Sequence, residues 1–292
     1  MEAARTSDLL ALVASVVDKY ADELVEFRRD IHAHPELSWA EQRTCDRIAE
    51  QLERSGWRIS RMPRSGIVAD LGATGPRVAL RADIDALPVD DLTTDPWRSK
   101  TPGVAHSCGH DIHTTALVGA AHALAEAHRQ GLLAGQVRLL FQPAEEVMPG
   151  GAKHLINHGA LEGVDRIFAL HCDPSVDVGA VGLRAGPITS AADMVEVRLA
   201  EALPYAGSLR LELLRDTPQS RLQGGRGRKG AKRDEARRSV CAPNAKDSAL
   251  FVQRIPVEGF ERICGQHCPG QRCQARHIGV MCAFVAPSLN PG

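Results

Sequence analysis

The first 199 residues alternate between helical and strand-like patterns of hydrophobic positions. Apolar residues recur every three or four positions between Leu9 and Phe27, and a similar stretch at 41–54 ends before Gly56. Further helices are expected at 114–128 and 152–158. Short apolar runs bounded by Gly, Pro or Asp predict strands at 67–69, 78–80, 137–141 and 167–170. This alternation predicts an α/β domain with a largely parallel sheet flanked by helices.

Charged and metal-ligating side chains follow three of the expected strands. After 78–80, 137–141 and 167–170 come, in turn, Asp83 with Asp85, Glu145 with Glu146, and His171. In open α/β sheets, ligands bind outside the carboxyl ends of the strands, so these side chains would share one edge. The loop before the helix at 114–128 adds Cys108 and His110. Thiolate, imidazole and carboxylate groups at one edge are typical of a transition-metal site.

Each of these residues also has a plain structural interpretation. Glu145 and Glu146 could be a solvated charge pair at a helix start, and Asp83 and Asp85 could end a strand. For each residue taken alone, the structural interpretation is better than the metal-site interpretation. Taken together at consecutive strand ends, the residues favour a metal site. Five other histidines are interpreted as structural, with His113 close enough to support the site: His32, His34, His113, His154 and His158.

Composition narrows the class of protein. The chain has 292 residues, of which 43% are hydrophobic and 24% charged, enough for one large or two smaller domains. It has no run of about 18 apolar residues and no basic start followed by an apolar segment, so we expect neither a membrane span nor a signal peptide. We therefore expect a cytoplasmic protein whose eight cysteines are thiols.

The net charge of −1 conceals two unlike parts. Residues 1–199 carry 20 Lys and Arg against 28 Asp and Glu, whereas residues 200–292 carry 15 against 8. The first part is acidic and the second is basic.

Five segments of the acidic part form a recognisable series. In chain order they read FRRDIHAHPEL at 27–37, LRADIDALP at 80–88, HSCGHDIH at 106–113, FQPAEE at 141–146 with GGA at 150–152, and ALH at 169–171. With these segments the chain resembles the bacterial and plant amidohydrolases of the hippurate hydrolase, indole-acetyl-amino-acid hydrolase and N-acyl-diaminopimelate deacetylase type. These belong to the aminoacylase-like co-catalytic metallopeptidases.

The resemblance implies an enzyme that hydrolyses the amide bond of small N-acyl amino acids or small peptides with two divalent ions, Mn, Zn, Ni or Co. It implies Glu145 as the general base that takes a proton from the attacking water, and Asp83 as a residue that orients a ligand histidine. The ligands that it implies, with the Cys108 thiolate bridging, are Cys108, His110, Glu146 and His171. The choice of base and ligand within the glutamate pair rests on the resemblance alone.

The family pattern stops after residue 199. Its members would continue with a Gly-rich segment, a lid domain that carries a histidine and forms the dimer, and a last ligand histidine, none of which is found here. We therefore divide the chain into an incomplete catalytic domain at 1–199 and a tail at 200–292. The tail replaces the lid and dimerisation domain, which argues against the family-type homodimer.

Residues 200–292 are expected to be irregular. The segment 221–238 is rich in Arg and Gly and cannot bury enough apolar surface to order itself. We interpret the tail as the product of a frameshift near residue 200. One alternative is an inactive pseudoenzyme fragment. Another is a zinc- and nucleic-acid-binding module, because Cys264, Cys268, Cys273 and His277 are spaced loosely like a zinc knuckle beside basic sequence.

The frameshift hypothesis makes a prediction about the gene. If Pro204 and Tyr205 are encoded by CCA and TAY, the neighbouring frame begins His-Thr, near the expected lid histidine. We expect sequencing of the gene through these codons to restore the family pattern in that frame. An uninterrupted frame shared with close relatives would contradict the hypothesis.

Overall fold

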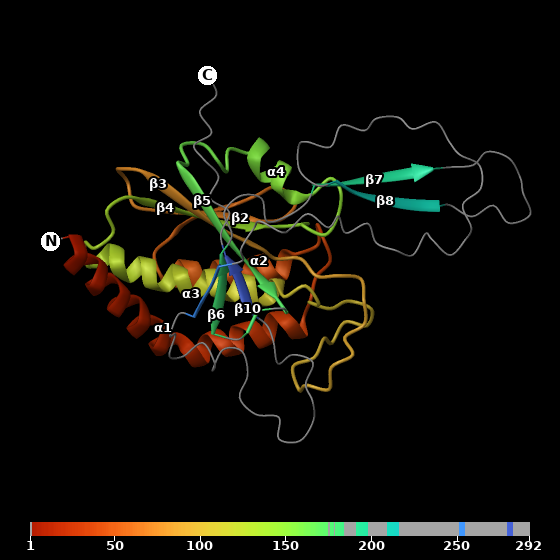
Figure 1. Cartoon of the computed structure of the whole chain (residues 1–292), viewed down its shortest axis with the longest axis horizontal. Helices are drawn as coiled ribbons and strands as arrows, with labels where there is room; N and C mark the ends of the chain where they lie inside the picture. Colours follow the sequence, from red (N-terminus) through yellow and green to blue (C-terminus); the bar gives the residue numbers. More distant parts are fainter. Residues whose placement is uncertain are drawn as a thin grey trace, which may run out of the picture. The chain divides into compact units, whose positions relative to one another are not determined.

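The computed structural model describes residues 2–174, 176–177 and 179–183, together with strands at 191–197, 209–215, 251–254 and 279–282 (Figure 1). The chain divides into two compact units, Met1–Leu183 with Val252–Gly292, and Arg184–Phe251. In the second unit, β7 (Ala191–Val197) pairs antiparallel with β8 (Leu209–Arg215). The Arg- and Gly-rich segment and the Cys/His group of the tail lie outside the described residues.

An eight-stranded sheet forms the centre of the first unit, in the order β1-β2-β4-β3-β5-β10-β6-β9. Its central strands β4, β3 and β5 are parallel, as the alternating pattern predicts, whereas β2 runs antiparallel to β4 and β10 antiparallel to β5. The sheet is therefore mixed. Its strands are β1 (Arg58–Arg61), β2 (Ile67–Leu71), β3 (Arg77–Asp83), β4 (Gln136–Gln142), β5 (Arg166–Asp173), β6 (Ala180–Leu183), β9 (Phe251–Arg254) and β10 (Gly279–Cys282).

Within the described residues, four helices occupy the positions expected from the sequence. They are α1 (Glu2–Ala33), α2 (Gln42–Arg54), α3 (His110–Arg129) and α4 (Gly151–Asn157). The helix α3 begins at His110 rather than at Thr114. Its first turn contains buried polar residues, so the apolar pattern of the sequence does not reveal it. None of the described helices combines the length and the apolar character that a membrane span requires.

Helices cover both faces of the sheet, as strand alternation dictates (Figure 1). On one face, side chains of α1, α2 and α3 such as Phe27, Ile48 and Val118 pack against Ile67 and Phe141. On the other face, the alternate residues of the same strands join α4 in a smaller cluster of Val68, Ala79, Leu140, Leu155 and Ala160. The α/β class expected from the sequence is confirmed.

The expectation of an irregular C-terminal third stays a prediction. The strands β8, β9 and β10 lie within residues 200–292. The remainder of that region lies outside the described residues.

The packing of the larger core predicts that truncation of two isoleucines will lower the stability by different amounts. Ile48 of α2 is 0% exposed and Ile156 of α4 is 52% exposed. Because truncation leaves a cavity only at the buried position, Ile48→Ala should lower the free energy of unfolding by about 2–5 kcal/mol. Ile156→Ala, the matched control, should change it by about 0.5 kcal/mol. Urea unfolding of both variants measures this, and equal effects would contradict the packing.

Candidate metal centre

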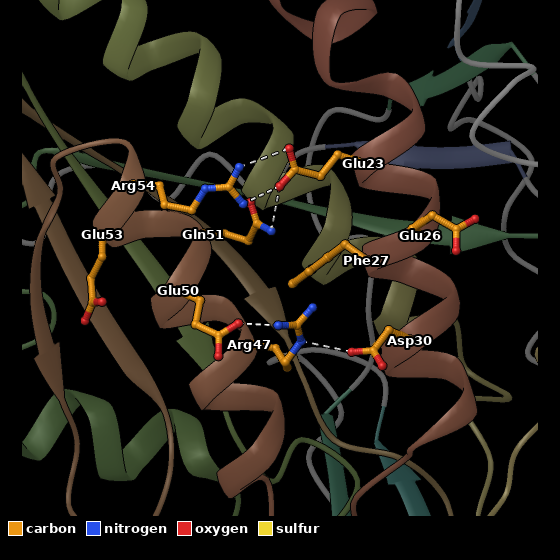
Figure 2. Close-up of a pocket in the computed structure, with 9 residues that line it drawn as sticks. All are labelled: Glu23, Glu26, Phe27, Asp30, Arg47, Glu50, Gln51, Glu53 and Arg54. Atoms are coloured by element: carbon orange, nitrogen blue, oxygen red, sulfur yellow. Dashed lines mark hydrogen bonds and ion pairs between the residues drawn. The ribbon is translucent and has the colours of Figure 1, made fainter.

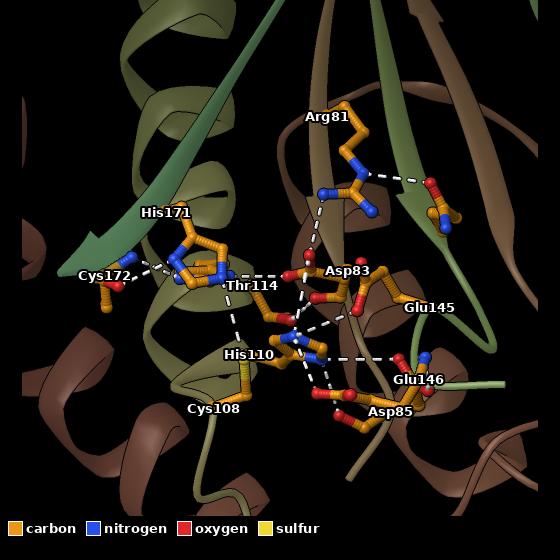
Figure 3. A network of polar contacts seen from close by, with 12 residues as sticks. Arg81, Asp83, Asp85, Cys108, His110, Thr114, Glu145, Glu146, His171 and Cys172 are labelled. Atoms are coloured by element: carbon orange, nitrogen blue, oxygen red, sulfur yellow. Dashed lines mark hydrogen bonds and ion pairs between the residues drawn. The ribbon is translucent and has the colours of Figure 1, made fainter. Parts of the chain in front are cut away.

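The carboxyl ends of β3 and β4, together with β5, bring the expected site residues together (Figure 3). Asp83 is the last residue of β3, Glu145 and Glu146 lie in the loop after β4, and His171 lies within β5 rather than after it. Cys108 precedes α3, and His110 is its first residue. Figure 3 shows Glu145 and Glu146 on one side of His110, with Cys108 and His171 on the other.

These side chains form two overlapping groups with the reach of a metal site. One ligand atom each from Cys108, His110 and His171 lie within 4.8 Å of one another, and the same holds for His110, Glu145 and Glu146. His110 belongs to both groups and is fully buried. All six candidate residues of the sequence analysis therefore meet, since Asp83 Oδ2 lies 3.6 Å from His110 Nε2.

His110 and His171 are oriented in the same way. The Nδ1 of His110 lies 2.8 Å from the backbone oxygen of Asp85, and the Nδ1 of His171 lies 2.7 Å from that of Cys172. A carbonyl oxygen can only accept, so each Nδ1 carries a proton and each Nε2 is the nitrogen left to face the site. Metal-binding histidines are commonly held in this way.

Two buried atoms face each other across a gap beside His110. The Nε2 of His110 and the Oε1 of Glu146 are 3.7 Å apart, and neither has a hydrogen-bond partner within the described part of the chain. Buried polar atoms without partners are costly, and a cation between them would satisfy both. The donor set of imidazole, thiolate and carboxylate fits a transition metal.

The surrounding charges favour a positive charge at this gap. Burial opposes protonation of His110, but the neighbouring side chains of Asp85 and Cys108 and the charge of Asp83 raise its pKa to about 11. Since Nδ1 already carries a proton, the added charge falls at Nε2, where a metal ion would bind. The neighbouring imidazoles of His110 and His171 also lower the pKa of the Cys108 thiol, which favours the thiolate.

His113 contacts the site but has no nitrogen left for a metal. Its Nδ1 lies 2.5 Å from Asp83 Oδ1, and its Nε2 accepts the backbone N–H of Cys172 at 2.8 Å. Asp83 also accepts a hydrogen bond from Arg81 at 2.7 Å. The ring of His113 packs 4.8 Å from that of His171, between centroids. Asp83 and His113 thus form a buried support beneath the site.

Gly109 allows Cys108 and His110 to face the same space. It has φ 88°, in the left-handed region, and a Cβ at this position would lie 3.2 Å from the Cβ and the Sγ of Cys172. A larger residue would be strained and crowded there.

The other histidines singled out in the sequence are engaged elsewhere. His32 lies 3.0 Å from the buried carboxylate of Asp111, and His34 lies 2.8 Å from the backbone oxygen of Asp30. His154 and His158 lie 2.6 and 2.7 Å from backbone oxygens of Pro63 and His154. These contacts agree with their interpretation as structural residues.

A groove of about 620 Å³ between α1 and α2 lies apart from these residues (Figure 2). Most of its charged side chains pair with one another: Arg47 contacts Asp30 and Glu50, and Arg54 contacts Glu23. It contains neither cysteine nor histidine. We interpret it as a solvated charged surface.

The chain is similar to a known family over most of its length. The family described as Peptidase family M20/M25/M40 matches residues 79–278, a range that continues past residue 199. A Rhodococcus jostii (strain RHA1) protein named as glutamate–cysteine ligase 2-3 is 50% identical over 196 residues, 66% of this chain and 24% of that protein. The N-acetyl-L-cysteine deacetylase of Bacillus subtilis (strain 168) is 44% identical over 193 residues, 63% of this chain and 46% of that protein.

A solved structure from the same family also matches the chain. The Bacillus subtilis YxeP protein, described as a dinuclear metal-binding peptidase from the M20 family, matches with a TM-score of 0.57 and 40% identity. The match covers 61% of this chain and 50% of that one. The chain thus spans between a quarter and about half of the length of these relatives.

The buried support beneath the site yields a stability prediction. An Asn at position 83 cannot accept from both Arg81 and His113, and His113 cannot move its proton to Nε2 without losing the bond to Cys172. Asp83→Asn should therefore lower the free energy of unfolding by about 2–4 kcal/mol. The control is Asp70→Asn at the more exposed pair with Arg138, expected to cost about 1 kcal/mol or less. Equal losses in urea unfolding would contradict the role of Asp83.

Proposed function

The chain belongs to peptidase family M20/M25/M40, and from this we propose that it is a metal-dependent hydrolase of the amide bond in N-acyl amino acids. The observation that carries the proposal is the pair of unpartnered buried atoms, His110 Nε2 and Glu146 Oε1, in the described part of the chain. They face each other beside a thiol and a second imidazole.

We assign Cys108, His110, Glu146 and His171 as ligands of two divalent ions. His110 and His171 each have one available nitrogen and can serve one ion each. Cys108 would contribute an anionic ligand beside them, since its lowered pKa favours the thiolate. When bound, the ions would polarise the amide carbonyl and lower the pKa of water towards about 7. Mn, Zn, Ni and Co are all compatible with this donor set.

Glu145 is our candidate for the general base. Its side chain is 42% exposed, against 20% for Glu146, so it is the member of the pair that an incoming water and substrate could reach. Its carboxylate would take a proton from the attacking water and return it to the departing amine. Asp83 would act indirectly, because it fixes His113 against the ring of His171.

The names of relatives support the substrate class. Besides the deacetylase above, the N-acyl-L-amino acid amidohydrolase of Geobacillus stearothermophilus is 37% identical over 190 residues, 64% of this chain and 51% of that protein. We also propose a cytoplasmic location, and that residues 200–292 replace the lid and dimerisation domain. On that basis we expect metal binding with low turnover in this chain.

The function is tested by metal content and hydrolysis of a panel of N-acyl amino acids by the full chain with added Mn or Zn. We expect bound metal and weak turnover that a chelator abolishes. Glu145→Gln should lower kcat by about 10²–10⁴-fold with metal retained. Glu146→Gln should weaken metal binding by about 10-fold or more.

Glu53→Gln on the exposed face of α2 is the matched control and should change neither quantity. Wild-type protein that binds metal but never turns over would support the pseudoenzyme alternative. Protein that binds no metal would contradict the assignment of the site.

A further inference from the structure

Glu41 is a buried carboxylate that no step above uses. It is 0% exposed, and its Oε1 accepts the backbone N–H of Ala144 at 2.7 Å, across 103 residues of sequence. Burying an ionisable side chain is unfavourable unless its hydrogen bonds compensate. Its position therefore points to a specific role at Ala144.

The side chain of Glu41 is free for this contact because another residue caps its helix. Glu41 stands at the N-cap of α2 but makes no side-chain capping bond. Glu36 caps the helix instead, because its two carboxylate oxygens accept the N–H groups of Arg43 and Thr44 at 3.0 and 2.7 Å. The start of α2 is thus satisfied without Glu41.

Ala144 is the residue at which the loop after β4 must be held. Its φ is 49°, a left-handed conformation unfavourable for a residue with a side chain, and it immediately precedes Glu145. Its carbonyl accepts the N–H of Gly151 at 2.9 Å, and a Cβ at Gly151 would overlap the carbonyl oxygen of Pro143. Two residues after Ala144, the N–H of Glu146 donates to Asp85 Oδ2 at 3.1 Å.

We infer that Glu41 is a positioning residue, whose carboxylate holds the turn at Ala144 and thereby directs the side chains of Glu145 and Glu146 at His110. The inference rests on the proposed function in so far as these side chains serve metal and catalysis. Its structural part, the fixing of the loop, stands on the contacts of Ala144 alone.

Loss of Glu41 should affect the two ligand groups differently. The His110–Glu145–Glu146 group depends on the loop after β4. The Cys108–His110–His171 group is set by Gly109, α3 and β5, whereas the carboxylate of Glu41 bonds to Ala144 in the loop after β4. Removing Glu41 should therefore release the carboxylates and spare the thiolate.

The test is a titration of the full chain with Co²⁺, followed by thiolate-to-cobalt absorption and by the number of ions bound in equilibrium dialysis. We expect Glu41→Ala to keep the thiolate band within about two-fold of the wild-type affinity and to bind the other ion about 10–100-fold more weakly. Glu41→Gln, which keeps an acceptor for Ala144, should restore both ions. Gln51→Leu removes another buried polar group from α2, bonded to His122 and Glu23, and should change neither.

Amide hydrogen exchange of the metal-free protein supplies a second readout. In Glu41→Ala, the peptide covering 142–151 should exchange about 10-fold faster or more, whereas Gln51→Leu should leave it unchanged. If Glu41→Ala does not fold, Glu41→Asp serves, since its shorter side chain cannot reach Ala144.

The inference would be overturned if the alanine or aspartate variant kept the wild-type exchange rates and bound both cobalt ions with wild-type affinity. Wild-type protein that binds no cobalt would instead remove the proposed function. The exchange rates would then still decide whether Glu41 holds the loop.

Discussion

The contact on which the rest of the site depends is the hydrogen bond from His110 Nδ1 to the backbone carbonyl of Asp85. It fixes the tautomer of His110, so that the lone pair of Nε2 is turned towards Glu146. The side chain of the same aspartate accepts from Ser38 at 2.6 Å and from the N–H of Glu146 at 3.1 Å. Asp85, a single residue in the segment that follows β3, thus connects the segment before α2, the first turn of α3 and the loop after β4.

The sheet register explains why these segments meet. In the parallel pairing of β3 with β4, Asp83 lies opposite Gln142, so both strands end at the same level. On the other side, Arg81 lies opposite Ala169, which places His171 of β5 level with Asp83. Parallel strands cannot be joined by a tight turn, and their crossover connections leave the loops free to carry chemistry at that shared edge.

The sequence is sufficient to predict the elements with strong periodicity and to place the residues at the ends of buried strands. Asp83, Glu145 and His171 could be placed at one edge because apolar runs mark the strands that carry them. The strand at 58–61 could not be found, because it is largely exposed and has no apolar run. The contact between Glu41 and Ala144 could not be found either, since it depends on how α2 packs against a loop 103 residues away. The same holds for the double engagement of His113, which needs both β3 and β5 in place.

The electrostatics of the site tie its chemistry to its folding. Asp83 and Asp85 are buried, Glu146 is half-buried, and burial raises the pKa of Glu146 because ionisation there is poorly solvated. The same carboxylates help to raise the pKa of His110 to about 11, which favours a proton on its Nε2. A divalent ion would displace that proton, since both compete for the same lone pair on Nε2. The residues that make the site suitable for metal therefore also favour a proton at the same place. Metal affinity should accordingly couple to stability through His110, whichever of the four candidate metals is bound.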